Sequence, residues 1–97
     1  MKKIFKDKEK AYILTIEDYY IQMTCNNPYA YETADGRYPI CSICYTKIAK
    51  KYSTMFIENE REIPRTEFVD EFKALLFLET HFSNEAANEF LEACKSI

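Results

Sequence analysis

The chain of 97 residues contains one glycine, one histidine and no tryptophan. One glycine cannot build a glycine-rich phosphate loop, so the common nucleotide-binding motifs are excluded. A histidine-dependent catalytic triad would have to use His81, and no partner motif accompanies it. The acidic residues also lack a spacing that indicates a paired acid and base. The sequence therefore favours a protein without catalytic activity.

Long apolar runs are also missing. After the basic start MKKIFKDKEK, the run AYILTI ends at Glu17 and Asp18. A signal peptide needs a core of about 7 to 15 apolar residues, and a membrane-spanning helix needs about 20. We therefore expect no membrane partner and a cytoplasmic location. Cysteines stay reduced there unless they bind metal or take part in catalysis.

Hydrophobic residues make up 47% of the chain and charged residues 30%, which is typical of a globular protein. The length indicates a single domain over residues 1–97, in which residues 1–9 form either a flexible arm or a first edge strand. Eight Tyr and seven Phe are many for this length. Tyrosine joins an apolar ring to a polar tip, so it suits the edge of a core or an interface.

The N-terminal half predicts short antiparallel strands. Residues 11–25 alternate in a way that suits strands, although Thr15 and Asp18 also resemble a helix start. Asp35-Gly36 is a strong hairpin signal, with strands near residues 29–33 and 37–41.

Three helices are predicted to follow. The first starts at Cys44 and has an apolar stripe of Ile48, Tyr52, Met55 and Phe56. After a connector, the second covers residues 66–82, with Thr66 as its N-cap and the apolar run ALLFL inside it. Ser83 caps the third, in which Ala87, Phe90, Leu91 and Cys94 share one face. The fold class expected is α+β, with strands first and helices after.

The cysteines allow three interpretations: structural thiols, a redox pair at Cys41 and Cys44, or a metal site. Cys25, a turn, the Asp35-Gly36 hairpin and the pair Cys41-x-x-Cys44 follow one another. Over about residues 25–52 this layout resembles that of treble-clef zinc fingers, although Pro28 stands where the second knuckle ligand should be. The resemblance implies one zinc ion held by Cys25, Cys41 and Cys44, with His81, Cys94 or water as the fourth ligand; His81 is the candidate we name.

Charge divides the chain into a basic and an acidic half. Residues 1–54 carry nine Lys or Arg and six Asp or Glu, whereas residues 55–97 carry four and ten. A dedicated nucleic-acid binder normally has a strong basic excess, so we favour a protein partner. The candidate partner-binding residues are Tyr45, Lys47, Lys50 and Lys51 in the basic half and Glu67, Asp70 and Glu71 in the acidic half.

These observations predict a small protein-binding module, either an adaptor or a stoichiometric inhibitor that occupies a surface of a larger partner. Accessory proteins of phages and mobile elements, including inhibitors of host defence, often have this character. The alternative is a zinc-stabilised, treble-clef-like module that contacts nucleic acid through the basic helix after Cys44. If the sheet leaves the ALLFL helix partly uncovered, a homodimer is the simplest way to bury it.

Overall fold

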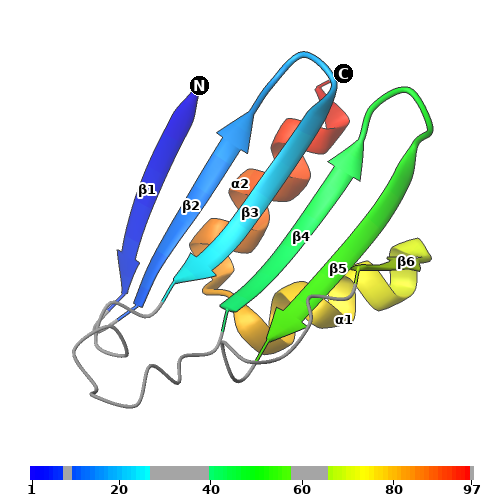
Figure 1. Ribbon diagram of the computed structural model, residues 1–97. Coiled ribbons are helices and arrows are strands. Elements are labelled where there is room, and N and C mark those ends of the chain that lie inside the picture. Colours follow the sequence, from blue (N-terminus) through cyan, green and yellow to red (C-terminus); the bar gives the residue numbers. More distant parts are fainter. Residues whose placement is uncertain (8–9, 27–39, 58–65, 97) are drawn as a thin grey trace.

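The computed structural model describes residues 1–7, 10–26, 40–57 and 66–96. Within these ranges the chain forms six strands and then two helices: β1 (Lys2–Asp7), β2 (Lys10–Ile16), β3 (Tyr20–Asn26), β4 (Ile40–Thr46), β5 (Lys51–Ile57), β6 (Thr66–Val69), α1 (Glu71–His81) and α2 (Asn84–Lys95). Each strand pairs antiparallel with the next one, so the order in the sheet is the order in the sequence (Figure 1). The α+β class and the strands expected within residues 11–25 are confirmed.

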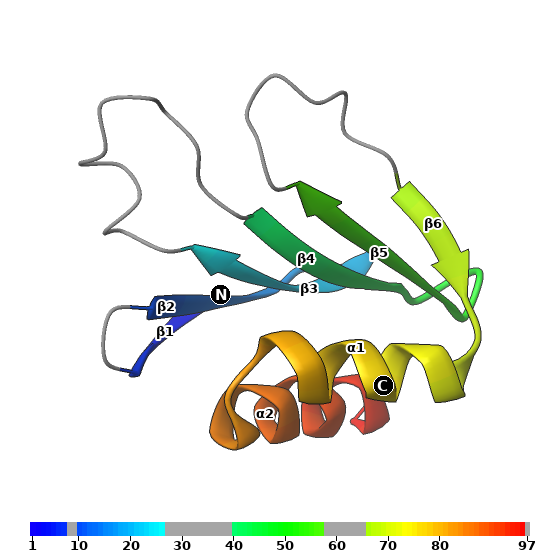
Figure 2. The ribbon, with the colours of Figure 1, turned by 90° about the horizontal axis from the view of Figure 1, so that it is seen from below.

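Both helices lie on one face of the sheet, as Figure 2 shows. α2 packs on β2 and β3, whereas α1 packs on β4, β5 and β6. We call the face toward the helices the covered face and the other the open face. The structure is thus a two-layer sandwich of one sheet and one pair of helices.

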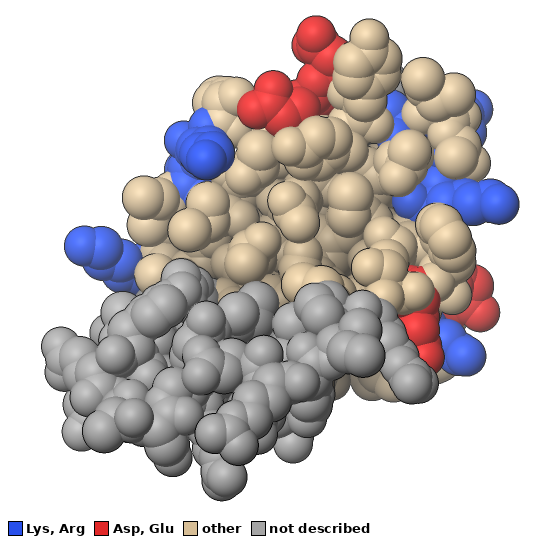
Figure 3. Space-filling view, in the orientation of Figure 1, with Lys and Arg blue, Asp and Glu red and all other residues tan. Residues whose placement is uncertain are grey.

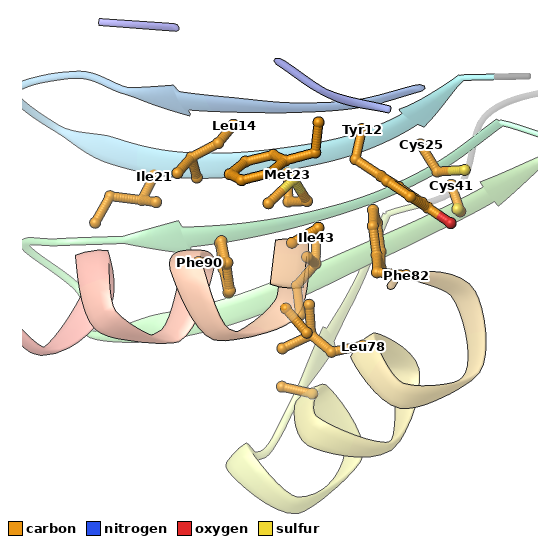
Figure 4. Close-up of a cluster of buried hydrophobic side chains, with 14 residues drawn as sticks. Tyr12, Leu14, Ile21, Met23, Cys25, Cys41, Ile43, Leu78, Phe82 and Phe90 are labelled. Carbon is orange, nitrogen blue, oxygen red and sulfur yellow. The ribbon is translucent and has the colours of Figure 1, made fainter. Parts of the chain in front are cut away.

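Side chains alternate between the two faces along each strand, because successive residues of a strand point in opposite directions. On the covered face Leu14 pairs with Met23, and Met23 pairs with Ile43. All three are at most 2% exposed and meet Phe90 of α2, which is fully buried (Figure 4). The core therefore forms where the central strands meet α2, and its buried residues are Phe5, Tyr12, Leu14, Ile21, Met23, Cys25, Cys41, Ile43, Ala74, Leu78, Phe82, Ala86, Ala87 and Phe90.

The last predicted helix is confirmed. Ser83 is its N-cap, and the hydroxyl of Ser83 accepts a hydrogen bond from the backbone N–H of Ala86 at 3.2 Å. Ala87 and Phe90 are buried, while Leu91 and Cys94 are partly buried against the same core.

The predicted helix after Cys44 is wrong. Residues 40–57 instead form a hairpin in which β4 and β5 are joined by the turn at 47–50. Lys50 closes this turn with a φ of 53°, a left-handed conformation that is uncommon outside glycine. Ile48, which the helical stripe would bury, is 80% exposed. Cys41, Ile43 and Tyr45 alternate along the chain and share the covered face, and this period of two is that of a strand.

The predicted helix at 66–82 is correct only in its second part. Residues 66–69 form strand β6, and the helix starts after Asp70. The N-cap is therefore Asp70, whose carboxylate accepts a hydrogen bond from the backbone N–H of Lys73 at 2.8 Å, and not Thr66. The hairpin predicted at Asp35-Gly36 and the connector at 58–64 lie outside the described residues. Residues 2–7 form edge strand β1.

We predict that Asp70→Ala lowers the free energy of unfolding by about 1 kcal/mol, because the first turn of α1 loses its cap. The control Thr66→Ala changes it by less than about 0.5 kcal/mol, since Thr66 is exposed at the start of an edge strand. Urea unfolding of the two variants checks this. Equal losses would contradict the assignment of Asp70 as the cap.

Candidate protein-binding surface

Helix α1 is apolar on almost every side, and the sheet covers only one of them. Ala74 and Leu78 face the sheet and are each 1% exposed. On the outer side, Phe72 is 75% exposed, Leu76 54% and Leu75 37%. Residues three and four apart are neighbours on a helix surface, so these three side chains form one cluster, which we call the α1 patch. A helix that is apolar all round is normally buried all round.

Strand β6 adds to this apolar surface. Phe68 lies on the open face at the edge of the sheet and is 74% exposed. Its ring has the Lys51 ammonium 5.8 Å from its centre. Of the ten exposed large apolar side chains in the described ranges, five belong to β5, β6 and α1. The exposed apolar surface is therefore concentrated at one edge of the molecule.

A groove runs between α1 and the covered face of β5 and β6. It consists of two hollows of about 260 and 350 Å³, both lined by Thr54 and Phe77. We call it the β6 groove, and its other lining residues are Phe56, Glu67, Val69, Lys73, Leu76, Thr80 and His81. Since Leu76 belongs to both, the groove and the α1 patch are continuous.

The β6 groove has a polar group in its floor. Thr54 is 9% exposed, and its neighbours on the covered face across the two adjoining strands are Ile43 and Glu67. Its hydroxyl makes no hydrogen bond within the part of the chain that the structure describes. A buried hydroxyl without a partner costs stability.

Carboxylates surround this surface. Residues 66–82 carry four acidic side chains and one lysine. Asp70 caps α1, which leaves Glu67, Glu71 and Glu79 exposed at the rim together with Lys73. Of the predicted acidic partner-binding residues, Glu67 lines the groove and Glu71 is exposed at the start of α1, whereas Asp70 caps the helix.

The predicted basic residues are divided between two environments. Lys47 is half-buried and Lys50 is exposed in the turn between β4 and β5, and Lys51 starts β5. The centre of the open face has no charged side chains, and Lys or Arg side chains appear at its two sides (Figure 3). Tyr45 packs on the covered face against Tyr52, with ring centres 4.8 Å apart. Because these residues form a hairpin, the nucleic-acid alternative loses the recognition helix that it required.

The structure brings together two of the four predicted zinc ligands. Cys25 and Cys41 are cross-strand neighbours on the covered face and are both buried (Figure 4). Cys44 is three residues further along the same strand, so it points to the open face. The ring of His81 lies 4.6 Å from that of Phe77 and 4.9 Å from that of Phe56. No cluster of three or more potential metal ligands occurs in the described ranges.

Two other thiol environments favour the protonated form. Burial raises the pKa of Cys44, and a hydrogen bond with Thr46 opposes this in part. Burial, with a smaller effect of Cys44, raises the pKa of Cys94 to about 12. A thiol is nucleophilic only as the thiolate, so neither group is activated at neutral pH. Cys41 lies in strand β4 in the middle of the sheet and not at a helix start.

Sequence reasoning did not select Phe68, Phe72, Leu75 or Leu76 as binding residues. The signal was available in the run ALLFL, which leaves a helix with little polar surface. Only the position of α1 at the margin of the sheet shows which of these side chains stay exposed.

In the described ranges, no helix has the length and hydrophobicity to cross a membrane. No family model matches the chain, and no curated protein or solved structure shows significant similarity to it.

The raised pKa of Cys94 predicts a loss of stability in alkali. Between about pH 9 and about pH 12 the unfolded thiol loses its proton whereas the folded thiol keeps it, so the free energy of unfolding falls as pH rises. We expect the Tm of the protein to fall more steeply between about pH 8 and about pH 10.5 than the Tm of Cys94→Ser. The pKa of Tyr52 is raised mainly by burial and in part by Cys94, so the substitution reduces this second alkaline loss of stability as well and acts in the same direction. Parallel Tm curves would contradict the assignment.

Proposed function

We propose that the chain is a non-catalytic protein-binding module, which acts as an adaptor or stoichiometric inhibitor by occupying a surface of a larger protein. The observation that carries this proposal is the exposure of the α1 patch, a cluster of large apolar side chains on the side of α1 that the sheet does not cover. Contiguous exposed apolar clusters next to polar rims are typical of protein interaction sites.

The energy that such a contact offers is substantial. Burying a Phe or Leu side chain completely is worth about 1.5 to 3 kcal/mol. Phe72 and Leu76 retain 75% and 54% of their accessible surface, so most of this free energy is still available to a partner. Large apolar anchors at the centre of an interface usually carry most of its affinity.

The acidic rim indicates the character of the partner surface. Glu67, Glu71 and Glu79 outnumber Lys73 around the patch and the groove. A basic surface would be attracted and oriented by this charge, which raises the association rate at low salt. Steric occupation of that surface is sufficient for inhibition or for bridging, and it requires no chemical step.

We predict that Phe72→Glu combined with Leu76→Glu abolishes partner capture from a lysate of the source organism. Both positions are exposed, so the double variant should keep its fold and Tm. The matched control Asn88→Glu adds a carboxylate at an exposed position of α2 and should capture the same partner. Affinity purification with mass spectrometry, followed by titration of the purified partner, measures this.

Two results would contradict the proposal. One is a partner that binds the Phe72→Glu/Leu76→Glu variant as tightly as the unchanged protein. The other is concentration-dependent dimerisation that this double variant removes, because a second copy of the chain would then cover the α1 patch.

A further inference from the structure

The two edges of the sheet are protected very differently. An exposed edge strand invites pairing with another chain, and lysines on the strand are a common way to prevent this. β1 carries Lys2, Lys3 and Lys6 among its six residues. β6 has the sequence TEFV, without lysine or proline, and its apolar residue Phe68 is 74% exposed. The β1 edge is therefore protected by three lysines, whereas the β6 edge has a single charged side chain, Glu67.

The open edge adjoins the apolar surface of α1. β6 pairs through Tyr52–Met55 of β5 on its inner side, and it is the last strand of the sheet. Val69 of β6 and Leu76 of α1 line the same groove. A strand added at the outer edge would place every second side chain on the covered side, toward the groove and α1. The outer edge of β6, which can pair with a backbone, and the β6 groove, which can hold a side chain, are therefore adjacent.

The floor of the β6 groove supplies a polar contact. Thr54 is nine-tenths buried, its hydroxyl is unpartnered in the described ranges, and the hollows around it hold about 260 and 350 Å³. This space admits one or two side chains from outside. A ligand group that hydrogen-bonds to the hydroxyl would remove the cost of its burial.

We propose that β6 is a strand-addition site, at which an extended, basic segment of a partner protein pairs with its outer edge and inserts into the β6 groove a largely apolar side chain whose polar tip hydrogen-bonds to Thr54. The inference rests on the proposed function, and it specifies how the partner is held. Main-chain hydrogen bonds to β6 supply affinity, and the groove selects the side chain. Basic residues of the segment face Glu67, which lies on β6 and lines the groove.

Charge and symmetry favour a different protein over a second copy. The β1 strand of another copy is also extended and basic, but β1 and β6 are opposite edges of the sheet. Their pairing would be head-to-tail and would continue from copy to copy into fibres. A segment of a different partner ends the assembly after one contact.

The binding site can be probed by phage display. A library of random 12-residue peptides is selected for binding to the immobilised full chain. We expect enriched peptides in which apolar residues alternate with other residues and Lys or Arg are frequent. Hydrogen exchange then distinguishes the binding modes: a synthetic peptide of this kind should slow exchange at residues 66–69. Peptides with helical spacing that leave exchange at β6 unchanged would overturn the proposal.

Thr54→Val supplies a second test with opposite effects on stability and binding. Removing the unpartnered hydroxyl should raise Tm by about 4 °C. Peptide affinity should fall by about fivefold to tenfold, because the ligand loses a buried hydrogen bond. The control Thr24→Val changes a threonine on the open face of β3 and should leave affinity unchanged. Unchanged affinity in Thr54→Val would overturn the role of the groove.

The two proposals fail in different ways. A captured partner that depends on Phe72 and Leu76 but leaves exchange at residues 66–69 unaltered would keep the protein-binding function and overturn strand addition. A partner that binds the Phe72→Glu/Leu76→Glu variant as tightly as the unchanged protein would overturn both proposals. The protein could instead form oligomers that grow with concentration and disappear in a Lys2→Glu/Lys3→Glu/Lys6→Glu variant. This result would identify β1 of a second copy as the segment that pairs with β6. It would overturn strand addition by a different protein.

Discussion

Two helices must cover one face of six strands, and most of the structure follows from that mismatch. Six strands span about 24 Å between the first and last axes, whereas two packed helices cover about 20 Å. α2 is centred on β2 and β3, and α1 on β4 and β5, so both margins of the sheet extend past the helices. At the β1 margin, Lys3 reaches Glu89 at 3.3 Å and lies 5.1 Å from the centre of the Phe5 ring. At the β6 margin the exposed side chains include the apolar Phe68 together with Thr66 and Glu67.

The composition of α1 turns this geometry into a candidate interface. Ala74 and Leu78 face the sheet, and the small Ala74 allows the helix to approach the strands closely. A surface helix usually presents charged residues on its other side. In α1 the other side carries Phe72 and Leu76, which add nothing to the packing of the core. A solvent-exposed Phe and Leu at neighbouring positions gain stabilisation only when a further surface covers them, so α1 has two packing faces and the sheet fills one.

The parts of the fold that sequence predicts well are those governed by local rules. Ser83 and the stripe of Ala87 and Phe90 define α2, because a cap and a 3.6-residue period act within one element. The hairpin of β4 and β5 escaped prediction because its turn, Lys47-Ile48-Ala49-Lys50, contains no Gly, Asn, Asp or Pro. Its residues favour helix locally, and pairing of β4 with β3 and β5 overrides that preference. The candidate binding residues could not be predicted individually, since exposure at a sheet margin depends on which strands α1 covers.

The same hairpin changes the meaning of the cysteine spacing. On a turn or helix start, two cysteines three residues apart can share one metal ion, but on a strand they face opposite sides of the sheet. Cys41 consequently joins the core beside Cys25, while Cys44 lies on the open face with a raised pKa. The spacing of Cys41 and Cys44 therefore does not bring the two thiols together on one face of the sheet. At the β6 margin, an unprotected strand edge and an uncovered apolar helix meet although neither property requires the other, and a binding site explains their coincidence better than packing does.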